Sequence, residues 1–346
     1  MPYTHFIVHP FTAGLDTQAA ATFVVPGGVT AASNAEYVIH LIPGAGPRVS
    51  IRKRPGTARY NATTTGATDI ITSLADFWRH GASLSPTQKF VACAADKVLK
   101  DDGDGVWDVL AASGFGGNTA LTDITIAEGL AIFANDQNQA PQSWDQTTYQ
   151  ALAGSPPKFS ASVYHLRRLF GIGIPATPSQ CTYSAGGAVT TWSGADTGSF
   201  IFDEDDGDRL IGVSDPFLKK LYFFKGPNLG GIHTVSGTTI TTFVKDKIFT
   251  GLPAQSQKGI ITTPSDIYWL SNVGFHSLSA TQKYGDTQAG FLSYPIQDQV
   301  RTLNQSRLKY AVGFYHPDRN LVGWACSTGS STWSVPGLAR QRHGAT

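Results

Sequence analysis

Three aspartates in one short segment are the residues best suited to hold a metal ion. Residues 100–108 read KDDGDGVWD, close to the Asp-x-Asp-Gly-Asp-Gly-x-x-Asp pattern of calcium-binding loops. Calcium takes roughly six to eight oxygen ligands, and Asp102, Asp104 and Asp108 could supply some of them. The first ligand position, however, holds Lys100, a cation where an oxygen is needed. The sequence therefore leaves a weak calcium candidate beside a tight acidic hairpin, and it predicts no other metal and no cofactor.

A second acidic run, Asp203–Asp208, places five carboxylates in six positions. Two carboxylates with separated pKa values could perform acid–base chemistry. Neighbouring positions on a strand point to opposite faces, however, so they do not act on one substrate atom. Runs of like charge are usually exposed to solvent. We predict a solvated turn here, with a metal site, a partner site or catalysis as the alternatives.

Patterns typical of catalysis are missing from the sequence. It contains no G-x-S-x-G elbow, no H-E-x-x-H zinc motif and no Walker A lysine. The histidines are scattered, and we interpret His165, His233 and His276 as hydrogen-bonded structural residues within strands. The Asp-box repeat of sialidase-type proteins is not intact either, since Phe200 occupies the threonine position of one partial copy and residues 327–333, the other, lack the aspartate. We predict no catalytic residue and no enzymatic activity.

The composition favours many short strands joined by turns. Of 346 residues, 41% are hydrophobic and only 15% are charged, with 37 glycines and 19 prolines. The formal net charge of +1 gives no global field for binding nucleic acid. The three cysteines are widely spaced, which predicts reduced thiols in a protein made in a reducing cytosol. We expect no signal peptide and no membrane span.

Six short β-rich runs recur along the chain and predict its architecture. Their starts are separated by about 38 to 52 residues, near the blade length of β-propellers. Turn-forming residues and a further strand-like segment follow each run, so each unit reads as a four-stranded blade. The runs begin at Phe90, Leu130, Arg168, Lys220, Ile267 and Ala311. We predict an all-β fold, a β-propeller of about six four-stranded blades.

The N-terminal part is expected to differ from the rest. Residues 1–45 read as an extended arm, and residues 46–346 as the propeller domain. A ring of blades must close, because open sheet edges invite unwanted pairing. We predict that strands within residues 48–75 close it by completing the last blade beside residues 311–333. One or two helical turns are expected within residues 296–306.

The order of several motifs resembles the β-propeller virion proteins of tailed bacteriophages. Lys53–Thr57 is similar to the KRPGT segment that precedes the first blade in that family. Residues 163–173 are similar to a family strand, and the acidic turn 205–212 followed by residues 221–225 is similar to another. Residues 266–278 are similar to a further strand pair. Unlike members that continue past the last blade, this chain ends soon after Trp333.

This resemblance implies a structural role rather than a chemical one. In short-tailed phages such proteins form the tail nozzle and close off the packaged genome. The implied function is a nozzle or hub ring that forms part of the DNA ejection channel, in a virion assembled in the bacterial cytoplasm. The implied partners are other tail proteins (adaptor or portal, fibres or needle), further copies of the chain in a ring of six, and DNA in transit.

Two other functions remain open at this point. A tail-associated propeller could instead bind a host glycan or receptor, which would require exposed aromatic side chains. Trp192, Trp269, Trp324 and Trp333 are available, although tryptophans in blades are mostly buried. A glycan-active enzyme is the remote alternative, since it would need two carboxyl groups roughly 5–10 Å apart in a cleft.

Overall fold

The computed structural model describes residues 14–15, 28–29, 35–42, 46–53, 65, 71–79, 87–117, 119–278, 292–317, 321–329, 333–334 and 339–340. Almost all of these residues belong to β-strands and the turns between them. Within this part of the chain no helix is long and apolar enough to cross a membrane.

Six antiparallel sheets follow one another along the chain from residue 71 onward. In the first five of these sheets, strands that are neighbours in sequence are hydrogen-bonded neighbours in space, so each of the five is a simple meander. The first sheet contains β5 (Ile71–Arg79), β6 (Thr87–Ala94), β7 (Lys97–Asp101) and β8 (Asp108–Ala111). The second contains β9 (Thr122–Ala127), β10 (Leu130–Asn135), β11 (Gln142–Trp144) and β12 (Tyr149–Ala151).

The next two sheets repeat this four-stranded order. The third contains β13 (Ala161–His165), β14 (Arg168–Ile172), β15 (Gln180–Tyr183) and β16 (Gly198–Ile201). The fourth contains β17 (Arg209–Val213), β18 (Leu221–Gly226), β19 (Gly231–Ser236) and β20 (Val244–Thr250).

The last two sheets are less regular. The fifth has three strands: β21 (Ile261–Thr262), β22 (Ile267–Leu270) and β23 (Phe275–Ser277). In the sixth, β25 (Leu321–Ser327) pairs with β24 (Val312–His316), β26 (Trp333–Ser334) and β27 (Ala339–Arg340). Each predicted β-rich run lies in a different sheet, as its second strand in the first five and as its first strand in the sixth.

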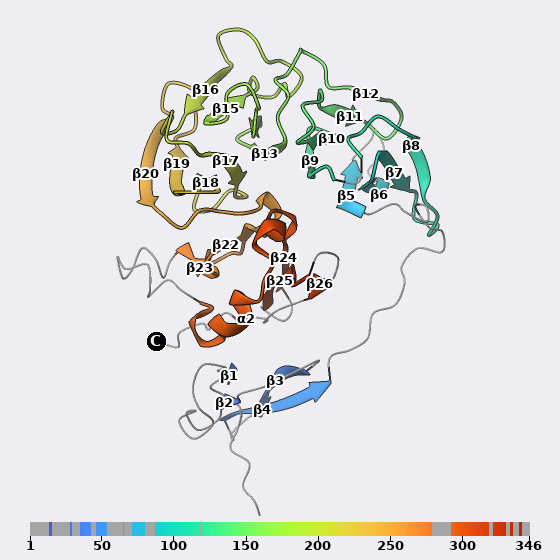
Figure 1. Cartoon of the computed structure of the whole chain (residues 1–346). Helices are drawn as coiled ribbons and strands as arrows, with labels where there is room; N and C mark the ends of the chain where they lie inside the picture. The colour runs from blue at the N-terminus through green and yellow to red at the C-terminus, as the bar shows by residue number, and fades with distance from the viewer. Residues whose placement is uncertain are drawn as a thin grey trace, which may run out of the picture.

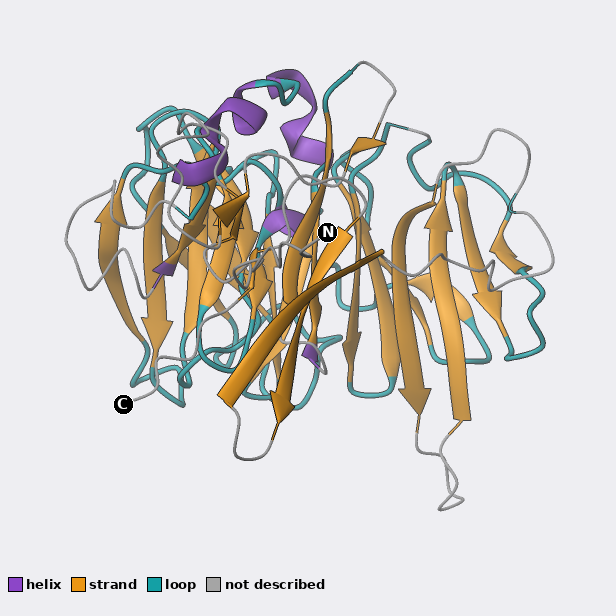
Figure 2. Ribbon diagram, turned by 90° about the horizontal axis from the view of Figure 1, so that it is seen from below, coloured by secondary structure: helices purple, strands orange, loops and turns teal. Residues whose placement is uncertain are grey.

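In the part of the chain that the structure describes, helical structure occurs only as short segments, as the sequence predicted. α2 (Gln297–Arg301) is flanked by two 3₁₀ turns, η2 (Tyr294–Ile296) and η3 (Gln305–Tyr310). Another 3₁₀ turn, η1 (Gln257–Gly259), precedes the fifth sheet. Figure 2 shows the larger helical segments at one end of the strands.

The sheets are arranged radially, so the chain is an all-β protein with a β-propeller fold (Figure 1). Five clusters of buried side chains each join two consecutive sheets. Phe77 and Phe133 join the first to the second, Phe170 and Phe223 the third to the fourth, and Trp324 belongs to the cluster that joins the fifth to the sixth. Two further clusters make the remaining consecutive joins. The hydrophobic core is therefore divided among the spaces between neighbouring sheets.

Among the described residues, the strands of the segment that was predicted to close the ring pair with partners other than the last blade. β4 (Gly46–Lys53) pairs with β3 (Ala35–Ile42), and β5 begins the first sheet by pairing with β6. The predicted boundary after residue 45 therefore falls between the paired strands β3 and β4. A short parallel pair, β1 (Gly14–Leu15) and β2 (Gly28–Val29), precedes that hairpin. The short β run predicted at residues 23–25 lies outside the described residues.

Candidate functional site

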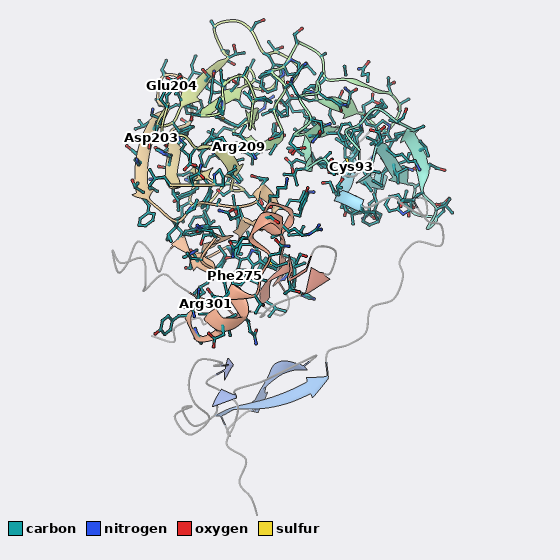
Figure 3. All side chains as sticks on the ribbon, viewed as in Figure 1. Cys93, Asp203, Glu204, Arg209, Phe275 and Arg301 are labelled. Carbon is teal, nitrogen blue, oxygen red and sulfur yellow. The ribbon has the colours of Figure 1, made fainter. Side chains whose placement is uncertain are left out.

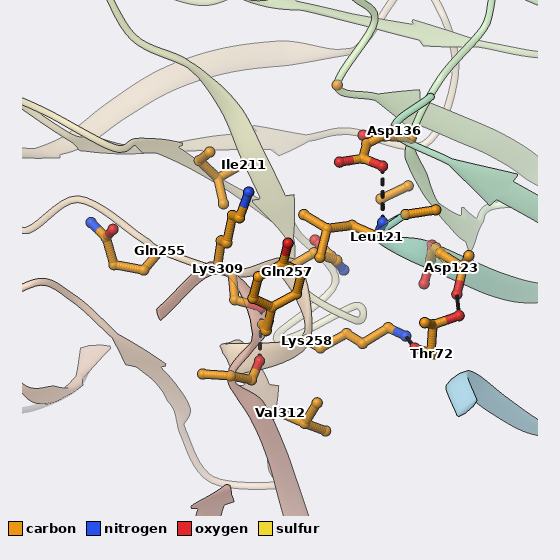
Figure 4. A pocket seen from close by; sticks show the side chains of 18 of the residues that line it. Thr72, Leu121, Asp123, Asp136, Ile211, Gln255, Gln257, Lys258, Lys309 and Val312 are labelled. Carbon is orange, nitrogen blue, oxygen red and sulfur yellow. Dashed lines mark hydrogen bonds between the residues drawn. The ribbon is translucent and has the colours of Figure 1, made fainter. Parts of the chain in front are cut away.

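A cavity of about 560 Å³ lies where the inner strands of the sheets approach one another (Figure 4). Such a volume is typical of small-molecule sites. The inner strands place residues around it because a radial arrangement brings the first strand of each blade nearest the axis. Its walls include Thr72 of β5, Asp123 of β9, Arg209 of β17, Lys258 of η1 and Val312 of β24. The cavity is therefore a product of the whole ring and not of one sheet.

Lys258 makes the longest-range contact in this cavity. Its ammonium group donates to the carbonyl oxygen of Thr72, which links η1 to the first sheet (Figure 4). The Thr72 hydroxyl accepts from Oγ1 of Thr122 at 2.8 Å and donates to the carbonyl of Cys93 at 3.2 Å. Burial lowers the pKa of Lys258, while Asp123 and Cys93 act in the opposite direction. This network connects three separate parts of the ring through polar groups.

Asp123 supplies a carboxylate to the same cavity. It accepts a hydrogen bond from the backbone nitrogen of Ser162 at 2.9 Å, across to the third sheet. Burial raises the pKa of Asp123, although the Ser162 hydrogen bond and Lys258 oppose that shift. The nearby thiol of Cys93 is fully buried, and burial raises its pKa to about 12. A protonated, inaccessible thiol is not a nucleophile, so these groups do not form a covalent catalytic centre.

Cations outnumber carboxylates on the cavity wall. Arg209, Lys258, Arg307 and Lys309 line it together with the two carboxylates of Asp123 and Asp136. Asp136 is already engaged, because it accepts from the backbone nitrogen of Leu121 at 2.9 Å. In Figure 3, Arg209 lies toward the centre of the ring. The cavity therefore favours anionic occupants over cationic ones.

The predicted calcium ligands surround an ammonium group. Nζ of Lys100 lies 2.5 Å from Oδ2 of Asp102 and 3.3 Å from Oδ2 of Asp108. Hydrogen bonding from Lys100 is the main reason that the pKa of Asp102 is lowered. Asp104 instead accepts from the backbone nitrogen of Val106 at 3.0 Å. Lys100 thus neutralises two of the three candidate carboxylates, and Asp104 is not brought to them.

No group of three or more potential metal ligands occurs anywhere in the part of the chain that the structure describes. The buried Asp101, which sequence reasoning passed over, shapes the turn instead. Its Oδ1 accepts from the backbone nitrogen of Gly103 at 2.7 Å and from that of Gly105 at 3.3 Å. Both glycines have positive φ, a conformation that most side chains resist. The segment has the contacts of an acidic hairpin.

The acidic run Asp203–Asp208 is folded around cations and is not simply a solvated turn. Asp206 accepts from the fully buried Lys225 at 2.6 Å, and Asp203 accepts from Lys247 at 2.6 Å. Asp208 accepts from two backbone nitrogens of the turn after β18, including that of Gly230 at 2.6 Å. Glu204, at the periphery in Figure 3, lines a second cavity of about 550 Å³ between this turn and residues 176–180.

The three histidines interpreted as structural lie within strands. His276 is fully buried, stacks on Trp269, and its Nε2 lies 2.7 Å from Oγ of Ser271. Burial lowers the pKa of His276 to about 3. His233 is also buried, with Nε2 3.3 Å from Oδ2 of Asp203. His165 ends β13, and burial lowers its pKa. The serine–histidine pair has no access to a substrate, because both residues are buried.

The tryptophans give little support to a glycan platform at the predicted positions. Trp269 and Trp324 are fully buried, and Trp192 is half-buried against Phe159. The side chain of Trp333 lies outside the described part of the chain. Trp78 on β5, which sequence reasoning missed, is 48% exposed and donates to Asp76 at 2.8 Å. Trp78 follows Leu74 by four residues, and residues an even number of positions apart lie on the same face of a strand. This pair of large apolar residues on one face is the sequence signal that could have identified Trp78.

Comparisons with known proteins add no family. No model of a protein family and no curated protein matches the chain. Among solved structures, it is similar to a quinoprotein alcohol dehydrogenase-like protein from Bacteroides thetaiotaomicron, at 12% identity over 78% of this chain and 68% of that one, with a TM-score of 0.39. BamB from Moraxella catarrhalis matches at 11% identity over 71% and 66% of the two chains, with a TM-score of 0.37. Likenesses this remote carry nothing about function.

Proposed function

We propose that this chain is a structural component of a bacteriophage tail, a nozzle or hub protein that forms part of the DNA ejection channel. The observation that supports the proposal most is where the resemblance motifs fall. Residues 163–173 form the β13–β14 hairpin, residues 205–212 with 221–225 enter β17 and β18, and residues 266–278 form β22 and β23. The motifs are thus successive hairpins of the ring, in the order found in the phage proteins.

The contacts within one motif also support a scaffold role. The motif is the one formed by residues 205–212 and 221–225. Asp206 in the turn before β17 and Lys225 on β18 form an ion pair that fixes the turn to the fourth sheet. Carboxylates used in this way hold a turn in place and are not available for chemistry. A motif that maintains the blade is what a structural protein requires.

The size of the central cavity restricts how DNA could pass. A cavity of about 560 Å³ is on the scale of a small ligand, and Lys258 bridges it to Thr72. A duplex therefore does not pass along the axis of one propeller. In a nozzle, the channel has to lie on the axis of a closed ring of several copies, which we propose to contain six.

Assembly of the full chain tests this proposal. The purified protein, alone and after mixing with the adaptor, portal or fibre proteins of its particle, is examined by native mass spectrometry and electron microscopy. We expect a closed ring that joins tail particles. A chain that stays monomeric under all these conditions and is absent from purified particles would overturn the proposal. Specific binding on a glycan array by a monomer would favour the receptor-binding alternative.

A further inference from the structure

The ring of sheets has one position at which two sheet faces lack a described neighbour. Figure 1 shows the first and sixth sheets at the two ends of the arc. Each of the five clusters that join sheets links consecutive ones, and none among the described residues joins the sixth to the first. We call the space between these two sheets the open position. A propeller stabilises its blades by packing each against two neighbours, so this position is where packing is incomplete.

Strand β5 exposes apolar side chains on the face that borders the open position. Ala75 and Phe77 belong to the cluster shared with the second sheet. Because side chains alternate along a strand, Leu74 and Trp78 lie on the opposite face, directed away from the second sheet. Leu74 is 60% exposed and Trp78 is 48% exposed. Large apolar side chains that are exposed together on one face of a strand are typical of a surface that another segment or molecule covers.

Strand β24 repeats this arrangement from the other side. Tyr315 packs with the cluster shared with the fifth sheet, and the backbone of Gly313 lies close against Ile261 of that sheet. Val312 and Phe314 alternate with them and are 42% and 41% exposed. Two strands that are far apart in sequence therefore present apolar residues toward the same position.

The β3–β4 hairpin has the pattern of a segment that would fill this position. In its register, Tyr37 lies opposite Ile51, Ile39 opposite Val49, and Leu41 opposite Pro47. These pairs share one face, because every second pair of an antiparallel ladder does so. The alternate pairs include Glu36 with Arg52 and His40 with Arg48, although Val38 and Ile42 also lie on that face. One face is thus apolar except at the open end of the hairpin, where Ala35 lies opposite Lys53, and the other face is mixed.

Stability and chain length both favour this occupant. An isolated two-stranded hairpin is at best marginally stable in water, so its apolar face needs a surface to cover. Residues 54–70 separate β4 from β5. At roughly 3.3 Å per residue when extended, they can span on the order of 50 Å, more than one blade position. The hairpin also directly precedes the first sheet in sequence, and consecutive elements usually lie side by side.

We infer that the β3–β4 hairpin inserts between the sixth and first sheets and closes the ring. Its apolar face covers Leu74 and Trp78 of β5, and its mixed face borders Val312 and Phe314 of β24. The closure differs from strand addition to the last blade, because the hairpin enters as a separate two-stranded sheet. The inference is independent of the proposed function in a phage tail, since any propeller has to protect these faces.

Paired cysteines in the full-length chain test the inference. Ile39→Cys with Leu74→Cys places one thiol on the apolar hairpin face and one on β5. His40→Cys with Leu74→Cys is the matched control, because His40 lies on the opposite face of the same strand. The three natural cysteines are buried and do not compete. We expect an intramolecular disulfide in the first variant. It should form roughly tenfold faster than in the control, which corresponds to a difference of about 1.4 kcal/mol in activation free energy.

Two results would overturn the inference. A disulfide that links two chains would make a second copy the occupant, and equal disulfide formation in test and control would place the hairpin elsewhere. Alkylation of the single variant Leu74→Cys provides a second measurement that needs no disulfide. Adding Ile39→Asp, which disfavours burial of the hairpin face, should raise its alkylation rate roughly tenfold, because protection depends on local opening. An unchanged rate would contradict the inference.

Discussion

The ammonium group of Lys225 lies 2.6 Å from Oδ2 of Asp206, and the lysine side chain is completely buried. The same group donates to the carbonyl oxygens of Phe202 at 3.0 Å and Asp203 at 2.6 Å. A buried charge is tolerated only when it is paired and hydrogen-bonded. The acidic turn before β17 is therefore held in place by a lysine on β18, the strand that pairs with β17.

Removing this lysine should destabilise the fourth sheet strongly. Lys225→Met keeps much of the side-chain volume but leaves Asp206 and two carbonyl oxygens without their donor. Breaking a buried ion pair from one side typically costs about 3–5 kcal/mol. We expect the free energy of unfolding to fall by about 3 kcal/mol, because Asp206 retains some contact with water. Urea unfolding followed by fluorescence measures this change.

Lys247→Met is the matched control for Lys225→Met. Lys247 also pairs with a carboxylate of the acidic turn, Asp203, at 2.6 Å, but its side chain is 44% exposed. Exposed ion pairs contribute only about 0–1 kcal/mol. If the free energy of unfolding falls as much in the control as in Lys225→Met, burial does not determine how much the ion pair contributes to stability.

Much of the fold follows from the sequence, because β-rich runs at blade-like spacing are local signals. Each predicted run is found in a different sheet, and residues 296–306 contain the predicted helical turns. Local signals of this kind do not decide how the ring closes. Residues 46–53 and 71–79 are both strand-like, and which strand each pairs with depends on long-range packing that propensity does not encode.

The candidate site was less predictable than the fold. The cavity collects residues from strands that are far apart in sequence, and Lys258 reaches Thr72 across 186 positions. No local pattern marks such a contact. The Lys100–Asp108 segment shows the opposite situation, since the lysine at the first ligand position already predicted a weakened calcium site and its ammonium group now lies between two of the carboxylates.

The buried histidine of β23 should make the protein sensitive to acid. Burial lowers the pKa of His276 from its ordinary value of 6.5 to about 3 in the folded state. Between these values the unfolded chain binds a proton that the folded chain does not, so stability falls as the pH falls. The slope should approach about 1.4 kcal/mol per pH unit below pH 6.5. Urea midpoints measured between pH 7 and roughly 4.5 test this slope while most carboxylates remain ionised.

Replacing the histidine separates its contribution from that of other groups. In His276→Gln, unfolding should take up as much as one proton fewer than in the natural chain. The free energy of unfolding should therefore change less steeply with pH, even if the variant is less stable at every pH. His316→Gln makes the same substitution at an exposed position on β24 and serves as the comparison variant. If His276→Gln retains the full slope, a different group causes the acid sensitivity.

One substitution should convert the hairpin at residues 100–108 into a cation site. Lys100→Asp removes the ammonium group between Asp102 and Asp108 and places a carboxylate at the first ligand position. Calcium that binds only the folded state stabilises it, and the melting temperature rises further as the calcium concentration exceeds the dissociation constant. We expect millimolar calcium to stabilise Lys100→Asp and to leave both the natural chain and the control Lys100→Met unaffected. Calcium stabilisation of the natural chain would contradict this account of Lys100.

The thiols should be unreactive in the folded protein. Cys93, Cys181 and Cys326 are all buried, and none forms a disulfide. Burial raises the pKa of Cys93 and of Cys326 to about 12 and also raises that of Cys181, so almost no thiolate exists near neutral pH. Since the thiolate is the reactive form, a chromogenic disulfide reagent should detect no thiol in the native state and three after unfolding in denaturant. Rapid reaction of Cys93 alone would instead reveal local opening of the first sheet, next to the position that the β3–β4 hairpin is inferred to fill.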